Sequence, residues 1–233
     1  MNDVEFTLTD LDFQLESLNF SDLSPSEFEN LVFHLIDEMG FSNLTWRKGG
    51  EGNSATDGGR DLEATYWRVE PVESAELTYW YEVKHRSGQL ERSQVQKAVL
   101  DASAEASLDH LVVVTNSTVS NPCLDWVRDF QSKHPRPSIS IWQGHDLEVL
   151  ARKNPRTLAR FIPTALSFSG RCKVIRSRFS NLFLLPSVDE LTELWENRES
   201  IDDRFLLLAA VLSESAYGDL AGANGGCRSA AKP

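Results

Sequence analysis

Two strand-like segments joined by a short acidic connection constrain the fold of this chain more than any other feature. Residues 61–68 and 77–84 are rich in aromatic and β-branched side chains, and the connection between them, 69–76, carries Pro71 and three glutamates. Such a composition is typical of a solvated hairpin connection, so we predict that the two strands pair antiparallel. This pairing would bring Asp61, which opens the first strand, close to the end of the second strand.

The second strand ends in Glu82-Val83-Lys84, and the side chains at 82 and 84 emerge on the same face because their spacing is two. With Asp61 beside them, Glu82 offers a second hard carboxylate ligand for Mg²⁺ or Mn²⁺, and the backbone carbonyl of Val83 offers a third oxygen. Lys84 is placed to orient a water and to stabilise anionic charge. The alternative reading is an ordinary salt bridge from Lys84 to a carboxylate on an exposed hairpin.

The remaining elements predict an α/β fold. A helix should follow Ser24, because Pro25 stands at its first position, Glu27 completes a capping box, and Gly40 ends the apolar stripe. Further elements are predicted as strands at 44–47, 111–115 and 139–143 and as helices at 93–106, 122–133, 145–152 and 155–161. Their order predicts a mixed central sheet of about five strands flanked by helices.

We predict four segments along the chain. Residues 1–22 form an acidic N-terminal arm, 23–163 form the α/β domain, 164–217 form a helical extension, and 218–233 form a disordered tail rich in Gly and Ala. The helical extension is predicted at 188–197 and 201–217, and the second of these is strongly apolar. An apolar helix of this kind needs a partner surface, which can be the domain itself or a second chain.

Composition limits the setting in which the chain acts. The three cysteines are widely spaced and form no C-x-x-C pair, which fits a reducing compartment and argues against a disulfide framework or a zinc knuckle. No apolar run approaches the length of a membrane span, and no signal-peptide pattern opens the sequence. We therefore expect a cytoplasmic protein without a membrane partner.

The net charge of −12 is unevenly distributed. Residues 1–40 carry ten acidic side chains and no Lys or Arg, whereas 41–186 carry nineteen basic against sixteen acidic side chains. A DNA-binding face is therefore possible but must be local. The main candidate is a basic stripe, for which a solvated helix face is the alternative; its members are Arg152, Lys153, Arg156, Arg160, Arg171, Lys173, Arg176 and Arg178.

The motifs together resemble a known family. The order is Phe28-Glu29 in a helix ending at Gly40-Phe41, then Asp57-Gly58-Gly59-Arg60-Asp61-Leu62, then Glu82-Val83-Lys84. Over residues 24–162 this pattern resembles the Mrr-type restriction endonuclease domain of the PD-(D/E)xK nuclease superfamily. The resemblance implies a restriction-endonuclease-like sheet and type IV-like, Mg²⁺- or Mn²⁺-dependent DNA cleavage. It also implies catalytic roles for Asp61, Glu82 and Lys84, with Glu29 as a supporting acid.

Three functions remain open at this point. The first is a DNA endonuclease acting in restriction or anti-phage defence, as a homodimer or with a sensor or NTPase module. The second is a catalytically inactive nucleic-acid-binding or assembly module on the same fold. The third is RNA cleavage by the same site, because a metal-assisted mechanism does not depend on the sugar.

Overall fold

The computed structural model of the chain describes residues 8–9, 12–47, 61–182, 186–204 and 206–208. Ser17–Phe161 form one compact unit, and Met1–Glu16 together with Ile162–Pro233 form another. Residues 57–60 of the glycine-containing motif, the end of the helix predicted at 201–217 and the predicted tail lie outside the described residues. The division into four segments stays a prediction.

A five-stranded mixed sheet forms the centre of the first unit, as the sequence predicts. The strands follow one another across the sheet in chain order, and they are β1 (Ser42–Trp46), β2 (Leu62–Val69), β3 (Ser74–Lys84), β4 (His110–Thr115) and β5 (Ser138–Trp142). β1, β2 and β3 pair antiparallel, whereas β4 and β5 are parallel to β3. The carboxyl ends of β3, β4 and β5 therefore meet at one edge of the sheet.

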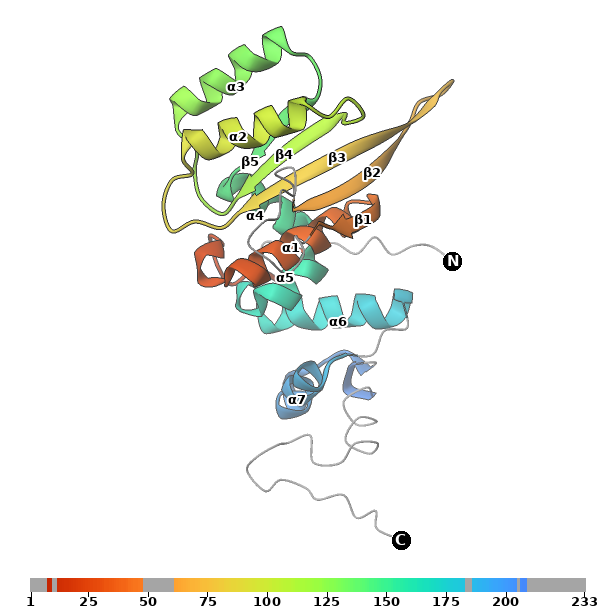
Figure 1. The fold of residues 1–233 in the computed structure, drawn as a ribbon. Coiled ribbons are helices and arrows are strands. Elements are labelled where there is room, and N and C mark those ends of the chain that lie inside the picture. Colours follow the sequence, from red (N-terminus) through yellow and green to blue (C-terminus); the bar gives the residue numbers. More distant parts are fainter. Residues whose placement is uncertain (1–7, 10–11, 48–60, 183–185, 205, 209–233) are drawn as a thin grey trace. The chain divides into compact units, whose positions relative to one another are not determined.

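Helices cover both faces of this sheet (Figure 1). On one face lie α2 (Arg92–Ser103) and α3 (Asn121–Lys133). On the other lie α1 (Pro25–Glu38), α4 (Gly144–Lys153) and α5 (Pro155–Phe161), and a 3₁₀ turn, Phe20–Asp22, precedes α1. This arrangement confirms the predicted α/β class.

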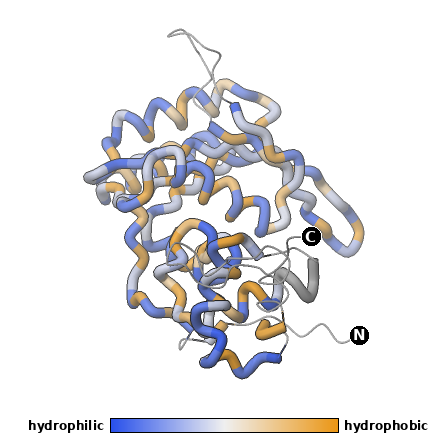
Figure 2. The backbone as a smooth tube through the Cα atoms, turned by 90° about the horizontal axis from the view of Figure 1, so that it is seen from below, coloured by the Kyte–Doolittle hydropathy of each residue, from blue (hydrophilic) through white to orange (hydrophobic). Residues whose placement is uncertain are grey.

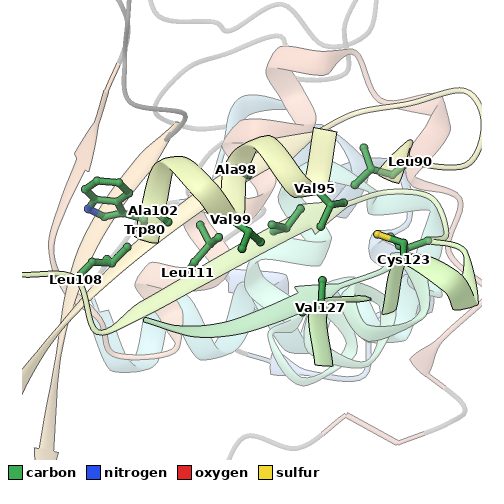
Figure 3. Packing of buried hydrophobic residues seen from close by; sticks show 12 residues of the cluster. Trp80, Leu90, Val95, Ala98, Val99, Ala102, Leu108, Leu111, Cys123 and Val127 are labelled. Carbon is green, nitrogen blue, oxygen red and sulfur yellow. The ribbon is translucent and has the colours of Figure 1, made fainter. Parts of the chain in front are cut away.

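The core under α2 and α3 shows which side chains of β3 share a face. Trp80 of β3 is 5% exposed and belongs to one core cluster with apolar residues of both helices, among them Val95, Val99 and Val127 (Figure 3). Hydrophobic residues recur at short intervals along the backbone (Figure 2). Because side chains alternate along a strand, the even-numbered positions after Trp80 point toward the side of the sheet that α2 covers.

The start of α1 confirms the predicted capping box. Ser24 accepts a hydrogen bond from the backbone N–H of Glu27, and the Glu27 carboxylate accepts one from the N–H of Ser24. Gly40, just past the helix, has φ of 84°, which is the left-handed region that glycine adopts without strain. Phe28 is fully buried on the face toward the sheet.

β3 begins at Ser74, three residues earlier than predicted. Residues 65–69 of β2 and 74–78 of β3 pair with each other beyond the part of β3 that borders β4. Most side chains on this ribbon are exposed, including Trp67 at 53%. The extension of β3 back to Ser74 was not predicted, because an exposed ribbon carries no regular alternation of apolar side chains.

The second unit contains a helix that the sequence analysis did not predict. α6 (Phe168–Leu182) precedes α7 (Val188–Glu196), and short 3₁₀ turns lie at Pro163–Ala165 and Arg198–Ser200. Arg, Lys and Ser residues interrupt the apolar pattern of α6, so its periodicity is weak. These helices confirm a helical C-terminal extension, and no described helix is long and apolar enough to cross a membrane.

Candidate active site

The pairing of β2 with β3 places Asp61 at the end of β3. Leu62 lies opposite Tyr81 in the antiparallel register, and the backbone N–H of Asp61 donates to the carbonyl of Tyr81 at 2.9 Å. The Asp61 carboxylate accepts a hydrogen bond from the N–H of Val83, with Oδ2 at 2.7 Å. The carboxylate is thus held over the residue between Glu82 and Lys84.

Lys84 joins the two carboxylates. Its Nζ lies 2.6 Å from Oε1 of Glu82 and 3.7 Å from Oδ2 of Asp61. The Glu82 side chain is 11% exposed, whereas those of Lys84 and Asp61 are 23% and 34% exposed. Three side chains that the sequence predicted to converge therefore lie together, on the face of β3 that also carries Trp80, at its carboxyl end.

The pKa of the Glu82 carboxyl is shifted strongly. Burial raises the pKa of Glu82 to about 7, although the positive charges of Lys84 and Lys97 act in the opposite direction. Asp61 adds to the rise because its negative charge lies close. Within the described residues, the Glu82 carboxylate forms an ion pair with Lys84 alone. A divalent cation bound here would favour the ionised form of Glu82, because its positive charge would balance the buried negative charge.

The donor set fits a hard divalent cation. Asp61 and Glu82 contribute carboxylate oxygens, which suit Mg²⁺ and Mn²⁺, and two protein carboxylates are sufficient for Mg²⁺ because this ion retains several waters. In the described part of the chain, no group of three or more His, Cys, Asp and Glu side chains could hold a metal ion. The ligand roles of Asp61, Glu82 and the Val83 carbonyl stay predictions.

Glu29 lies on α1, the helix that packs on the other face of the sheet. Phe28, its neighbour, contacts the ring of His85 at a centroid distance of 5.4 Å, so the first half of α1 approaches the chain just after Lys84. Glu29 itself is half-buried. The role of Glu29 as a supporting acid stays a prediction.

The side chain of His85 contacts Phe20 and Phe28. Its Nε2 lies 3.2 Å from the carbonyl oxygen of Phe20, and its half-buried ring packs on Phe28. These contacts tie the 3₁₀ turn before α1 to the end of β3. The geometry therefore favours a structural role for His85.

Sequence reasoning did not single out Arg86 and Asn116, which lie beside the three converging residues. The side-chain amide of Asn116 accepts from the N–H of Arg86 at 2.7 Å and donates to its carbonyl at 2.9 Å. Asn116 follows β4 directly, so this pair of bonds joins the carboxyl ends of two neighbouring strands. A polar residue just after a buried strand was the available sequence signal.

Much of the basic stripe is used in ion pairs within the protein. Lys173 lies 2.8 Å from Asp12, Arg152 lies 2.8 Å from Glu148, and the other two pairs are Arg171–Glu193 and Arg176–Asp203. The four cations therefore already have carboxylate partners. This pairing favours a structural role for them over a DNA-binding face.

Comparison with known families finds a match for most of the first unit. The family model Mrr_cat, described as a restriction endonuclease, matches residues 20–151, which is more than half of the chain. No curated protein matches the chain.

Two solved structures also match at low identity. The MspJI restriction endonuclease in complex with a 27-mer oligonucleotide shares 18% identity at a TM-score of 0.42, over 62% of this chain and 30% of that one. The DNA modification-dependent restriction endonuclease AspBHI shares 14% identity at a TM-score of 0.35, over 64% and 40%. The chain thus spans less than half the length of either enzyme. On the family match, this chain belongs to the Mrr-type restriction endonuclease domains.

Proposed function

We propose that this chain is a DNA endonuclease of a restriction or anti-phage defence system, which hydrolyses phosphodiesters with a bound Mg²⁺ or Mn²⁺. The convergence of Asp61, Glu82 and Lys84 at one edge of the sheet carries the proposal. Membership in the Mrr-type family supports DNA as the substrate class.

Each residue has a defined task in this proposal. Asp61 and Glu82 hold the cation, with the Val83 carbonyl as a further oxygen ligand, and Glu29 supports them from α1. A bound divalent cation supplies Lewis-acid stabilisation of the charge that develops on the phosphate. The Lys84 ammonium orients the attacking water and stabilises negative charge in the transition state. We assign Lys84 this electrostatic role because its Nζ lies within 4 Å of both carboxylates.

The proposal includes the active assembly and the cellular compartment. Cutting both strands of a duplex requires two such sites, so the active form is a homodimer or an assembly with a sensor or NTPase module. The site of action is the cytoplasm, in keeping with cysteines that are widely spaced in the sequence.

Plasmid and linear DNA cleavage tests the proposal. Wild type should cut with Mg²⁺ or Mn²⁺ and should stop with EDTA, and an RNA of the same sequence should be cut more slowly. Lys84→Ala and Asp61→Ala should each lower the rate by about 10³-fold or more, as loss of a transition-state donor or a metal ligand does. Lys133→Ala is the matched control, since this exposed lysine ends α3 and precedes β5, at the opposite end of the parallel strands.

Two results would overturn the proposal. Cleavage that survives Lys84→Ala or Asp61→Ala would remove these residues from the mechanism. A wild-type protein that binds DNA but cuts none with either metal would identify the chain as a binding or assembly module instead.

A further inference from the structure

Arg86 differs from six other arginines of the chain in the partners of its side chain. Within the described residues its guanidinium contacts neutral oxygens alone, with Nε and Nη2 at 3.2 and 3.1 Å from Oε1 of Gln94 and Nη1 at 3.0 Å from the carbonyl of His85. Other arginines contact carboxylates, namely Arg47, Arg68, Arg128, Arg152, Arg171 and Arg176. The Arg86 guanidinium is therefore held by neutral acceptors, and no carboxylate among the described residues is paired with it.

Gln94 places this charge on the side of the sheet that carries the candidate active site. Gln94 lies in the first turn of α2, which packs over Trp80 on the face that also carries Glu82 and Lys84. Because Arg86 reaches Gln94, its guanidinium lies on that side, two residues along the chain from Lys84. The side chain of Arg86 is exposed, so a ligand can reach it.

The backbone of Arg86 is held as firmly as its side chain. Asn116 binds both its N–H and its carbonyl, and the Asn116 amide also donates to the Ser21 hydroxyl at 3.2 Å. The turn that carries Asn116 packs closely on α4, since a Cβ on Gly144 would lie 2.7 Å from the Asn116 carbonyl oxygen. An exposed arginine with this much support is oriented before any ligand arrives.

Lys97 adds a second cation on the same helix. It lies three residues after Gln94, so the two side chains are neighbours on the surface of α2. Lys97 is exposed and forms no ion pair with any described residue, and its charge acts on Glu82. Lys84, Arg86 and Lys97 thus present three positive charges around one edge of the sheet.

We propose that Arg86 binds a DNA phosphate next to the one that is cut, with Gln94 and Asn116 as its positioning residues and Lys97 as a second contact to the backbone. A guanidinium whose donors face neutral acceptors exchanges them for a phosphate without breaking an ion pair. The proposal rests on the proposed function, because it assigns the path of the DNA to the α2 side of that site.

The salt dependence of DNA binding tests this subsite. Affinity of a Lys84→Ala protein for a labelled duplex is measured by fluorescence anisotropy in EDTA over a range of NaCl concentrations. Adding Arg86→Gln should weaken binding about tenfold at low salt and reduce the slope of log K against log salt by about 0.9, the value for one lost phosphate contact. Arg128→Gln is the control, because that arginine is also exposed but is paired with Asp125.

A nearly isosteric change tests the neutral partner directly. Gln94→Glu should give Arg86 a carboxylate partner, as other arginines of the protein have. It should then weaken DNA binding and lower the slope of log K against log salt, although Arg86 itself is unchanged. Gln96→Glu adds the same charge on another side of α2 and should have a much smaller effect. In the Lys84-intact enzyme, Gln94→Ala and Asn116→Ala should raise KM more than they lower kcat, since they orient a binding group.

The outcomes separate this inference from the proposed function. Wild-type cleavage with an unchanged salt slope in Arg86→Gln, or an equal loss in Arg128→Gln, would overturn the subsite and leave the nuclease intact. A reduced slope in Arg86→Gln from a wild type that cuts no DNA would support the subsite and overturn the nuclease. Urea unfolding of each variant shows that the fold is retained.

Discussion

Two lysine–carboxylate pairs, one in each unit, have almost the same geometry but opposite electrostatic outcomes. Lys84 lies 2.6 Å from Glu82 in the first unit, and Lys173 lies 2.8 Å from Asp12 in the second. Both carboxylates are buried. Yet the pKa of Glu82 is raised to about 7, whereas that of Asp12 is lowered below its ordinary value.

The difference lies in the remaining hydrogen bonds. Burial raises the pKa of Asp12, but the hydrogen bonds from Lys173 and from the N–H and hydroxyl of Thr9 more than offset it. Ser169 donates a further bond at 3.4 Å. Glu82 has only Lys84 within the described residues. Asp12 is thus bound by several donors, whereas Glu82 has one described partner, which fits the cation-binding role that we propose for it.

Glu82→Gln should produce the largest effect and should separate function from stability. Cleavage should fall by about 10³-fold or more, because the amide is a poor metal ligand. At pH 8 in EDTA, the free energy of unfolding should rise by about 1 to 3 kcal/mol, since the buried charge disappears. Urea unfolding measures the second change. A less stable variant would show that Lys84 compensates Glu82 as fully as Lys173 compensates Asp12.

Lys173→Met should do the reverse. Removing the ammonium leaves the Asp12 carboxylate buried with Thr9 and Ser169 as its remaining partners, which should destabilise the second unit by about 2 kcal/mol. Hydrogen exchange of the α6 amides should accelerate accordingly, while DNA cleavage stays within about twofold of wild type. Unchanged protection of α6 would show that this pair contributes no stability, and a large loss of cleavage would place it in the functional machinery.

The same contrast explains what the sequence could predict. Asp61, Glu82 and Lys84 were predictable together because hairpin register is local and side chains two apart share a face. The capping box of α1 was equally readable, as its signals lie within four residues. Arg86 was missed because its significance depends on Gln94 and Asn116, and the latter is thirty residues away. α6 was missed because the apolar face formed by Val174 and Ile175 is interrupted by charged residues.

The pH dependence of stability gives the smallest and most specific contrast. A folded-state pKa raised from 4.5 to about 7 means that folded Glu82 binds more protons than unfolded Glu82 between these values. The free energy of unfolding should therefore decrease as pH rises through this window, by at most about 1.4 kcal/mol per pH unit. Asp12 has a lowered pKa, so the stability it contributes is complete above about pH 5 and should not vary here. Urea unfolding of wild type and Glu82→Gln in EDTA, at intervals from pH 5 to 8, isolates the Glu82 contribution as the difference between the two curves. That difference should be small near pH 5 and should grow to a plateau above pH 7, and a constant difference across the range would contradict the account of Glu82 given above.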